Sequence, residues 1–279
     1  MLESAPLPPL EWTGERMVPE GSDAATFWDH VYRYRFASRF VNDKRVVDVA
    51  CGEGYGTHAL GLAGARSVIG FDISPEACEH AKSKYGIDAR CADATALTIP
   101  DSSVDVVVSF ETVEHVSNPG DFVRECARVL DQSGKLIIST PNQEVYSENG
   151  FQNSFHCSEM SRGEFESVLS RYFRTFTMYS QQTQTAPWWQ LRSFAATNSP
   201  WLNVRGFWRL RRWILPSTLG DGISGIKVPE DERLNIAATI LRQDGRLVRL
   251  LNPCEVRRAP ACRDERAKYL VAVCQGPKD

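Results

Sequence analysis

Residues 47–60 read VDVACGEGYGTHAL, and this stretch decides the fold. A short β-branched run leads into three glycines, Gly52, Gly54 and Gly56, and a segment of helical composition follows. Glycine lets the backbone turn sharply and approach a ligand without a Cβ in the way. A helix that begins after such a turn presents free N–H groups at its N-terminus. The pattern predicts a strand, a tight glycine turn and a helix, with a ligand held at the turn.

Apolar runs of the same kind recur along the chain. They are nearly continuous in apolar residues, which is typical of strands that are covered on both faces of a parallel sheet. The expected strands are residues 45–50, 67–72, 87–91, 104–110, 135–140 and, after a long interval, 269–274.

Helical segments are expected between these strands. Residues 27–41 have helical spacing. A Ser-Pro-Glu sequence at Ser74 and an Asn-Pro sequence at Asn118 are typical of helix N-termini, and Ser161 with Glu164 forms a capping box. Strands and helices that alternate in this way predict βαβ units and an α/β, doubly wound sheet.

The composition is that of a globular protein. Of the 279 residues, 42% are hydrophobic and 24% are charged, and the formal net charge is −3. This balance argues against a nucleic-acid-binding protein, which usually has a basic surface. No apolar stretch reaches the ~18 residues that span a bilayer, and the first residues lack the apolar core of a secretory signal. The eight cysteines form no CxxC pair, so we expect reduced thiols in a cytoplasmic protein.

Acidic residues lie at the ends of three expected strands. Asp72 ends the second strand, Asp93 follows the third, and Asp48 precedes the glycine turn. The carboxyl ends of neighbouring parallel strands meet at one edge of the sheet, where a carboxylate can accept hydrogen bonds from ribose hydroxyls. The glycines have G-x-G-x-G spacing, whereas a dinucleotide fingerprint has its third glycine one position later, at Thr57. The sequence therefore predicts a nucleoside site and weakens the case for a dinucleotide.

Five segments in this order resemble the motifs of class I S-adenosylmethionine-dependent methyltransferases: residues 47–56, 71–72, 92–93, 104–116 and 130–142. The resemblance implies a Rossmann-like sheet of seven strands whose last strand, here 269–274, is antiparallel. It implies that S-adenosylmethionine is the cofactor, with its methionine part at the glycine turn, its ribose at Asp72 and its adenine at Asp93. The cofactor-binding residues expected on this basis are Tyr34, Asp48, Ala50, Cys51, Gly52, Gly54, Gly56, Asp72, Ile73, Asp93, Ala94 and Phe110.

Three further segments, residues 13–19 (TGERMVP), 32–37 (YRYRFA) and 153–156 (NSFH), resemble a narrower group of methyltransferases found with sugar and glycan biosynthesis genes. The first two belong to an arm and helix expected to cover the active site. An arginine there, such as Arg16, is a candidate partner for the methionine carboxylate. Surface charge is the alternative role for such an arginine.

Transfer to a hydroxyl acceptor also needs a proton acceptor, and a positioned histidine is the usual base. His115 follows the fourth strand and His156 lies in the loop after the fifth, so both are candidates. Glu111 is a candidate to orient a histidine or the acceptor. The alternative is that both histidines only cap or bind the backbone. A magnesium-assisted variant needs several clustered carboxylates; Glu111 and Glu114 alone are too few, so no metal is expected.

The chain is expected to have four parts: an arm and helix (1–44), the cofactor core (45–184), an inserted lid subdomain (185–265) and the last strand with a tail (266–279). Residues 187–220 contain five tryptophans and five arginines but no acidic residue. Three interpretations remain for this segment: a lid or homodimer contact, a wall that binds the acceptor, or an amphipathic helix at 201–215 that lies on an anionic membrane.

The sequence therefore predicts a methyltransferase that acts on an oxygen of a sugar, nucleotide-sugar or glycan. One alternative is a phenolic, quinone or amine acceptor. Alternatives from other classes are an NAD-type oxidoreductase, which the glycine spacing disfavours, and a non-catalytic nucleoside-binding protein.

Overall fold

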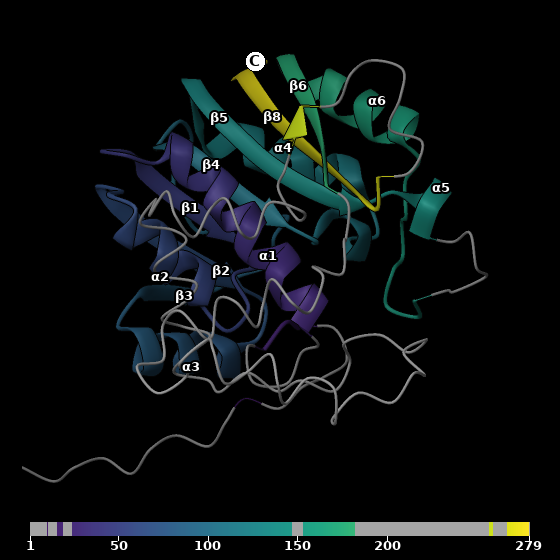
Figure 1. Ribbon diagram of the computed structural model, residues 1–279. Coiled ribbons are helices and arrows are strands. Elements are labelled where there is room, and N and C mark those ends of the chain that lie inside the picture. Colours follow the sequence, from purple (N-terminus) through teal and green to yellow (C-terminus); the bar gives the residue numbers. More distant parts are fainter. Residues whose placement is uncertain are drawn as a thin grey trace, which may run out of the picture.

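The computed structural model describes residues 10, 16–18, 24–146, 153–181, 257–258 and 267–278. They form one mixed sheet with helices on both faces (Figure 1). The strand order is β3-β2-β1-β4-β5-β8-β6-β7. The strands are β1 (Arg45–Val49), β2 (Ser67–Asp72), β3 (Asp88–Cys91), β4 (Val104–Phe110), β5 (Leu130–Pro141), β6 (Phe173–Gln181), β7 (Arg257–Arg258) and β8 (Tyr269–Pro277).

The first five strands are parallel, and β8 is antiparallel to both of its neighbours, β5 and β6. The predicted doubly wound sheet with an antiparallel last strand is thus confirmed. The two-residue strand β7 adds an edge beyond the seven predicted strands, where it pairs with Tyr179 and Ser180 of β6.

The helices are α1 (Ala24–Ala37), α2 (Tyr55–Leu62), α3 (Pro75–Tyr85), α4 (Pro119–Val129), α5 (Gln143–Tyr146) and α6 (Arg162–Tyr172), with the 3₁₀ turns η1 (Ser38–Phe40) and η2 (Val113–His115). The predicted N-termini are confirmed. The Ser74 side chain accepts a hydrogen bond from the Ala77 N–H, and Asn118 accepts one from the Gly120 N–H. Ser161 and Glu164 form the reciprocal capping box.

Two apolar layers lie on opposite faces of the sheet because successive strand residues point to opposite sides. Val46 and Val106 pack in the cluster that contains α1 and α2 residues. Their neighbours Val47 and Val107 pack in the cluster that contains α4 and α6 residues. Burial on both faces explains why the strand sequences are continuously apolar.

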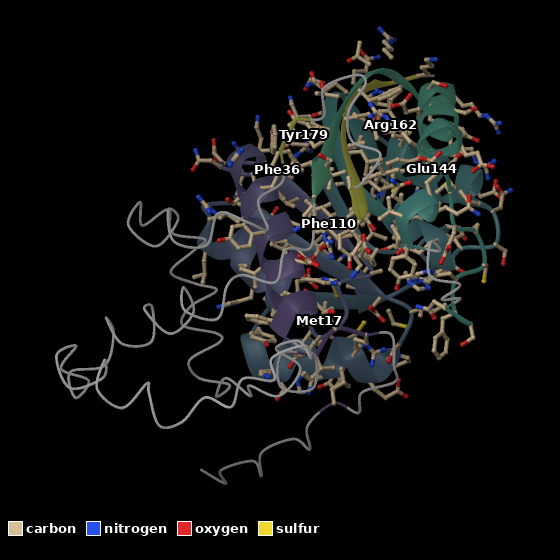
Figure 2. The ribbon with its side chains drawn as sticks, turned by 45° about the vertical axis from the view of Figure 1, so that its right-hand side comes forward. Met17, Phe36, Phe110, Glu144, Arg162 and Tyr179 are labelled. Carbon is tan, nitrogen blue, oxygen red and sulfur yellow. The ribbon has the colours of Figure 1, made fainter. Side chains whose placement is uncertain are left out.

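Helix α1 crosses one face of the sheet and reaches the late strands as well as the early ones (Figure 1). The Phe36 ring meets the Tyr179 ring edge-on, with 4.7 Å between centroids (Figure 2). The buried Arg33 side chain donates to Gln181 Oε1 at 2.9 Å. These contacts hold α1, which carries Tyr34, against the rest of the sheet.

The predictions for residues 185–265, including the insertion, the tryptophan- and arginine-rich segment and the amphipathic helix at 201–215, lie outside the described residues apart from β7. Among the described helices, none has the length and apolar character that crossing a membrane requires.

Candidate active site

A cavity of about 780 Å³ lies at the carboxyl ends of β1, β2 and β4. Its walls include the β1 turn at Gly52, the end of β2 at Asp72, and Glu111 after β4. Residues from α1 and from the start of β8, among them Tyr34 and Tyr269, close another side. The topology therefore gathers residues from distant parts of the chain at one edge of the sheet, which is where ligands bind in open α/β folds.

The glycine turn has left-handed backbone at Ala50 (φ 60°), Gly52 (φ 56°) and Gly54 (φ 97°). Only Gly52 of the three predicted glycines lines the cavity. A Cβ on Gly54 would lie 2.6 Å from the Ala81 Cβ, and one on Gly56 would lie 1.9 Å from Tyr34 Cζ. Gly54 and Gly56 are therefore needed for packing between helices, while Gly52 presents bare backbone to the cavity.

Asp72 is held at the cavity by backbone hydrogen bonds. It accepts one from the Gly52 N–H at 2.8 Å and one from the Ser74 N–H at 3.0 Å. Arg16 Nη2 lies 3.9 Å from Asp72 Oδ1, so the N-terminal arm reaches the predicted cofactor site. The carboxylate thus joins the β1 turn, the end of β2 and the arm.

Asp93 lies beyond β3, where it accepts hydrogen bonds from the Thr95 N–H and hydroxyl, both at 2.7 Å. These bonds lower the pKa of Asp93. Ile73 also lines the cavity and is 72% exposed, although large apolar side chains are usually buried. Asp93 therefore offers the cavity a hydrogen-bond acceptor, and Ile73 offers it an exposed apolar side chain.

Asp48 does not line the cavity but lies beneath the turn, fully buried. It accepts hydrogen bonds from the Thr57 hydroxyl at 2.6 Å and from the Tyr34 hydroxyl at 3.2 Å. Burial raises the pKa of Asp48 to about 7, against the opposing effect of these two donors. Its contacts tie β1, α1 and α2 together below the ligand site.

The other end of the cavity contains the predicted catalytic residues Glu111, His115 and His156. Glu111 has a left-handed backbone (φ 54°), which is costly for a residue with a Cβ and is found mainly where a site requires it. Its carboxylate accepts a hydrogen bond from the Ser139 hydroxyl at 2.6 Å and lies 4.0 Å from Arg33 Nη1. The structure thus aims this carboxylate at the cavity.

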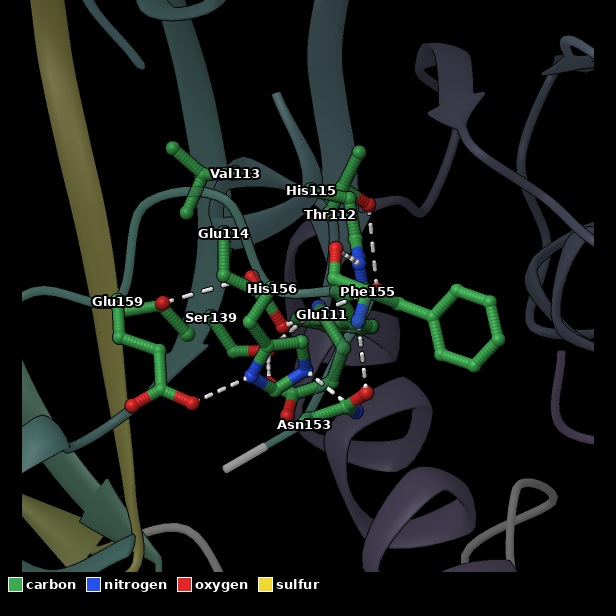
Figure 3. A network of polar contacts seen from close by, with 12 residues as sticks. Glu111, Thr112, Val113, Glu114, His115, Ser139, Asn153, Phe155, His156 and Glu159 are labelled. Atoms are coloured by element: carbon green, nitrogen blue, oxygen red, sulfur yellow. Dashed lines mark hydrogen bonds and ion pairs between the residues drawn. The ribbon is translucent and has the colours of Figure 1, made fainter. Parts of the chain in front are cut away.

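The histidine rings meet edge to face, with 4.8 Å between centroids (Figure 3). His115 Nδ1 is 3.2 Å from the Phe155 carbonyl oxygen, which can only accept, so Nδ1 carries the proton. His156 Nδ1 donates to Glu159 at 2.7 Å by the same reasoning. In both rings Nε2 is therefore the basic nitrogen, and for His156 it accepts a hydrogen bond from the Asn153 amide at 3.0 Å.

Glu114 lies next to His115 and is fully buried, although it is among the residues that line the cavity. Burial raises the pKa of Glu114 well above its usual range, and the charge of Glu111 adds to the effect. Its backbone carbonyl accepts hydrogen bonds from the N–H groups of Cys157 and Ser158, at 2.8 and 3.0 Å. These bonds hold the loop with His156 against η2.

The residues at the glycine end fit an adenosyl group. Gly52 offers an open cradle, since a Cβ there would find only the Arg16 side chain, at 3.5 Å. Asp72 and Asp93 supply acceptors for hydroxyl and amino groups, and Ile73 gives an apolar face for a base. Of the twelve predicted cofactor residues, all but Asp48, Gly54 and Gly56 line the cavity.

Sequence reasoning missed several cavity residues, among them His30, Tyr55, Tyr146, Lys268 and Tyr269. His30 and Tyr55 are joined by a 3.0 Å hydrogen bond across α1 and α2. Tyr269 is the first residue of the predicted last strand, and Lys268 directly precedes it. Their position at this strand end was the only feature of the sequence that could have indicated a place in the cavity.

Parts of this chain are similar to known methyltransferases. Residues 47–138 match a family model described as a methyltransferase domain. A probable S-adenosylmethionine-dependent methyltransferase of Mycobacterium tuberculosis is 38% identical over 165 residues, which are 57% of this chain and 60% of that protein. A ubiquinone biosynthesis O-methyltransferase of Parvibaculum lavamentivorans is 34% identical over 114 residues, 39% of this chain and 45% of the relative. The chain thus spans less than two thirds of the length of these curated relatives.

Two solved structures show the same fold. A chain from the complex of the Haloferax volcanii Trm112 methyltransferase activator with a methyltransferase has a TM-score of 0.55 and 16% identity, over 91% of this chain and 90% of its own. A SAM-dependent methyltransferase from Archaeoglobus fulgidus has a TM-score of 0.52 and 17% identity, over 90% and 94%. Residues 47–138 of this chain therefore match the methyltransferase domain model, and the longer matched segment is similar to a probable S-adenosylmethionine-dependent methyltransferase.

Proposed function

We propose that the protein as a whole transfers a methyl group from S-adenosylmethionine to an oxygen of a small-molecule or glycan acceptor. One observation carries this proposal: a single cavity connects the Gly52–Asp72–Asp93 end to the Glu111–His115–His156 end. A cofactor at the first end and an acceptor at the second would share one cavity, which lets the two be aligned for in-line displacement.

The glycine end is proposed to hold the cofactor, which supplies an already activated methyl group when bound. Gly52 lets the methionine part lie along the backbone, Asp72 accepts from the ribose hydroxyls, and Asp93 accepts from the adenine amino group. Arg16 is proposed to pair with the methionine carboxylate, since its guanidinium already lies beside Asp72.

The histidine end is proposed to orient the acceptor and accept its proton. The Phe155 carbonyl fixes the His115 tautomer so that basic Nε2 is the proton acceptor. His156 is fixed in the same way by Glu159 and is the second candidate. Glu111, held by Ser139, orients the acceptor hydroxyl.

For the acceptor we propose a sugar, nucleotide-sugar or glycan hydroxyl. The support is the resemblance of residues 13–19, 32–37 and 153–156 to glycan-associated methyltransferases, together with the position of Asn153 and His156 in the cavity wall. A phenol or quinone is the second candidate. The likeness to ubiquinone O-methyltransferases and the cavity residues Tyr146 and Tyr269 favour it. For residues 185–265 we propose a role in acceptor recognition.

Calorimetry with S-adenosylhomocysteine tests the cofactor proposal. We expect binding that Asp72→Asn weakens at least tenfold and that Asp88→Asn, a change in an exposed carboxylate of β3, leaves unchanged. NAD is expected not to bind. Binding of NAD but not of S-adenosylhomocysteine would overturn the proposal.

A screen of sugar, phenol and quinone acceptors with labelled S-adenosylmethionine tests the acceptor class. His115→Ala should lower kcat by roughly 10²–10⁴-fold, and His58→Ala should not. Methylation of a phenol or quinone alone would replace the sugar proposal. Near wild-type turnover by both His115→Ala and His156→Ala would remove the histidine base.

A further inference from the structure

A cluster of one carboxylate and two imidazoles lies at the acceptor end of the cavity. Glu114, His115 and His156 each offer one metal-binding atom, and these atoms lie within 4.8 Å of one another (Figure 3). All three residues line the cavity. They come from two segments that are far apart in the sequence, η2 and the loop before α6.

The buried carboxylate makes this cluster more than a chance group of polar residues. Glu114 is 0% exposed, and its Oε1 atom has no hydrogen-bond partner among the residues that the structure describes. That oxygen lies 3.9 Å from His115 Nε2. An unpartnered buried carboxylate oxygen is costly, and a nearby basic nitrogen cannot satisfy it without a proton or cation between them.

The second contacts of both histidines are those that metal-binding histidines have. A metal-binding imidazole usually donates its other ring N–H to a carboxylate or a backbone carbonyl. His156 donates to the Glu159 carboxylate and His115 donates to the Phe155 carbonyl. Each bond occupies Nδ1 and leaves Nε2 as the ring nitrogen that could bind a metal.

We propose that Glu114, His115 and His156 form a binding site for a divalent cation of the zinc class. Imidazole nitrogens with one carboxylate suit Zn²⁺, Co²⁺ or Fe²⁺ better than Mg²⁺ or Ca²⁺, which prefer oxygen ligands. Three protein ligands would leave a fourth position for a water or an acceptor oxygen, and all three residues line the cavity.

Binding would require a small rearrangement. Metal–ligand bonds of about 2.0–2.2 Å place tetrahedral ligands roughly 3.4 Å apart. The three atoms now lie within 4.8 Å of one another, so the widest pair would have to draw together by up to about 1.4 Å. The Asn153 amide, which now donates to His156 Nε2, would have to move away. A cation on His115 Nε2 and the proposed proton transfer to the same nitrogen exclude each other, so they are alternative states of this cluster. The inference itself rests on the geometry of the cluster and not on methyl transfer.

Cobalt(II) titration of the full chain tests the site, because tetrahedral Co²⁺ absorbs visibly and no turnover is needed. We expect one Co²⁺ per chain in the wild type, with competition by Zn²⁺. Glu114→Gln and His115→Ala should each weaken Co²⁺ binding at least 100-fold. Glu159→Gln, which removes the His156 partner, should weaken it roughly 10-fold to 100-fold. His58→Ala is the matched control and should bind as the wild type does.

Circular dichroism and binding of S-adenosylhomocysteine are measured on the same samples to show that each variant is folded. Glu114→Gln keeps the size and shape of the side chain, so it tests the ligand even if His115→Ala does not fold. No Co²⁺ binding by folded wild type, or binding that survives in Glu114→Gln and His115→Ala, would overturn the inference. Co²⁺ binding without S-adenosylhomocysteine binding would overturn the proposed function instead.

Discussion

At the scale of single residues, Gly56 shows how a motif residue can serve packing instead of a ligand. A Cβ at this position would fall 1.9 Å from Tyr34 Cζ, and Tyr34 is buried. We expect Gly56→Ala to lower the free energy of unfolding by about 1–3 kcal/mol, the usual cost of overpacking. Gly61 lies in the same helix with nothing within 4 Å of its added Cβ, so Gly61→Ala should be neutral or stabilising. Urea denaturation of both variants provides the measurement, and equal effects would contradict the packing explanation.

Asp48 should give the fold a characteristic dependence on pH. Burial raises its pKa from 3.8 to about 7 in the folded protein, so the folded state keeps a proton that the unfolded state has lost. The contribution of Asp48 to the free energy of unfolding should therefore fall as the pH rises from about 4 to 7, and should stay constant above that range.

Asp48→Asn removes this titration while keeping a side chain of similar shape. The difference in unfolding free energy between the variant and the wild type should shift in favour of the variant across that pH range, by up to about 4 kcal/mol. Urea unfolding at several pH values measures the difference. A difference that does not change with pH would show that Asp48 is ionised in the fold.

At the scale of elements, the start of α6 depends on its capping box. The Ser161 hydroxyl accepts from the Glu164 N–H, and the Glu164 carboxylate accepts from the Ser161 N–H at 2.8 Å. We expect Ser161→Ala to destabilise the protein by about 1 kcal/mol, because N–H groups at the first turn lose their partner. Ser170→Ala, in the same helix but exposed, should change stability by less than about 0.5 kcal/mol. Thermal unfolding measures the melting temperature of both variants. Equal melting temperatures for Ser161→Ala and Ser170→Ala would contradict the capping role.

The same scale shows what the sequence could and could not predict. The parallel strands were predictable because burial on both faces leaves continuous apolar runs, as at residues 104–110. No separate strand was identified at 173–181, because its run FRTFTMYSQ mixes exposed and buried residues. Two-residue β7 is too short for any periodicity to mark it.

The candidate site was predictable only in part. Asp72 and Asp93 were found because strand ends share an edge of the sheet. Gly54 and Gly56 were predicted to contact the cofactor, but in the structure they allow close packing instead. This could not be predicted because the residues they pack against, Ala81 and Tyr34, belong to other elements. The sequence named Glu114, His115 and His156 separately, but their approach to one another could not be predicted because η2 and the loop before α6 meet only in the fold.

At the scale of the whole molecule, β8 joins the two parts of the sheet. Val271 is 0% exposed and pairs with Ser139 of β5 and Tyr179 of β6. We expect Val271→Asp to destabilise the protein by about 3 kcal/mol or more, since it buries a charge without a partner. Gln275→Asp, at an exposed position of the same strand opposite Lys135, should be nearly neutral. Guanidinium unfolding measures both, and a cooperative transition of wild-type midpoint in Val271→Asp would contradict this account.

The position of β8 also has a consequence for biosynthesis. Strand β6 ends at Gln181, and its partner β8 begins only at Tyr269. While the ribosome makes the residues between them, the neighbouring edges of β5 and β6 have no partner, and unpaired edges invite association between chains. Nascent chains stalled before Tyr269 should therefore engage chaperones and be cut readily by protease, and release of the completed chain should end both.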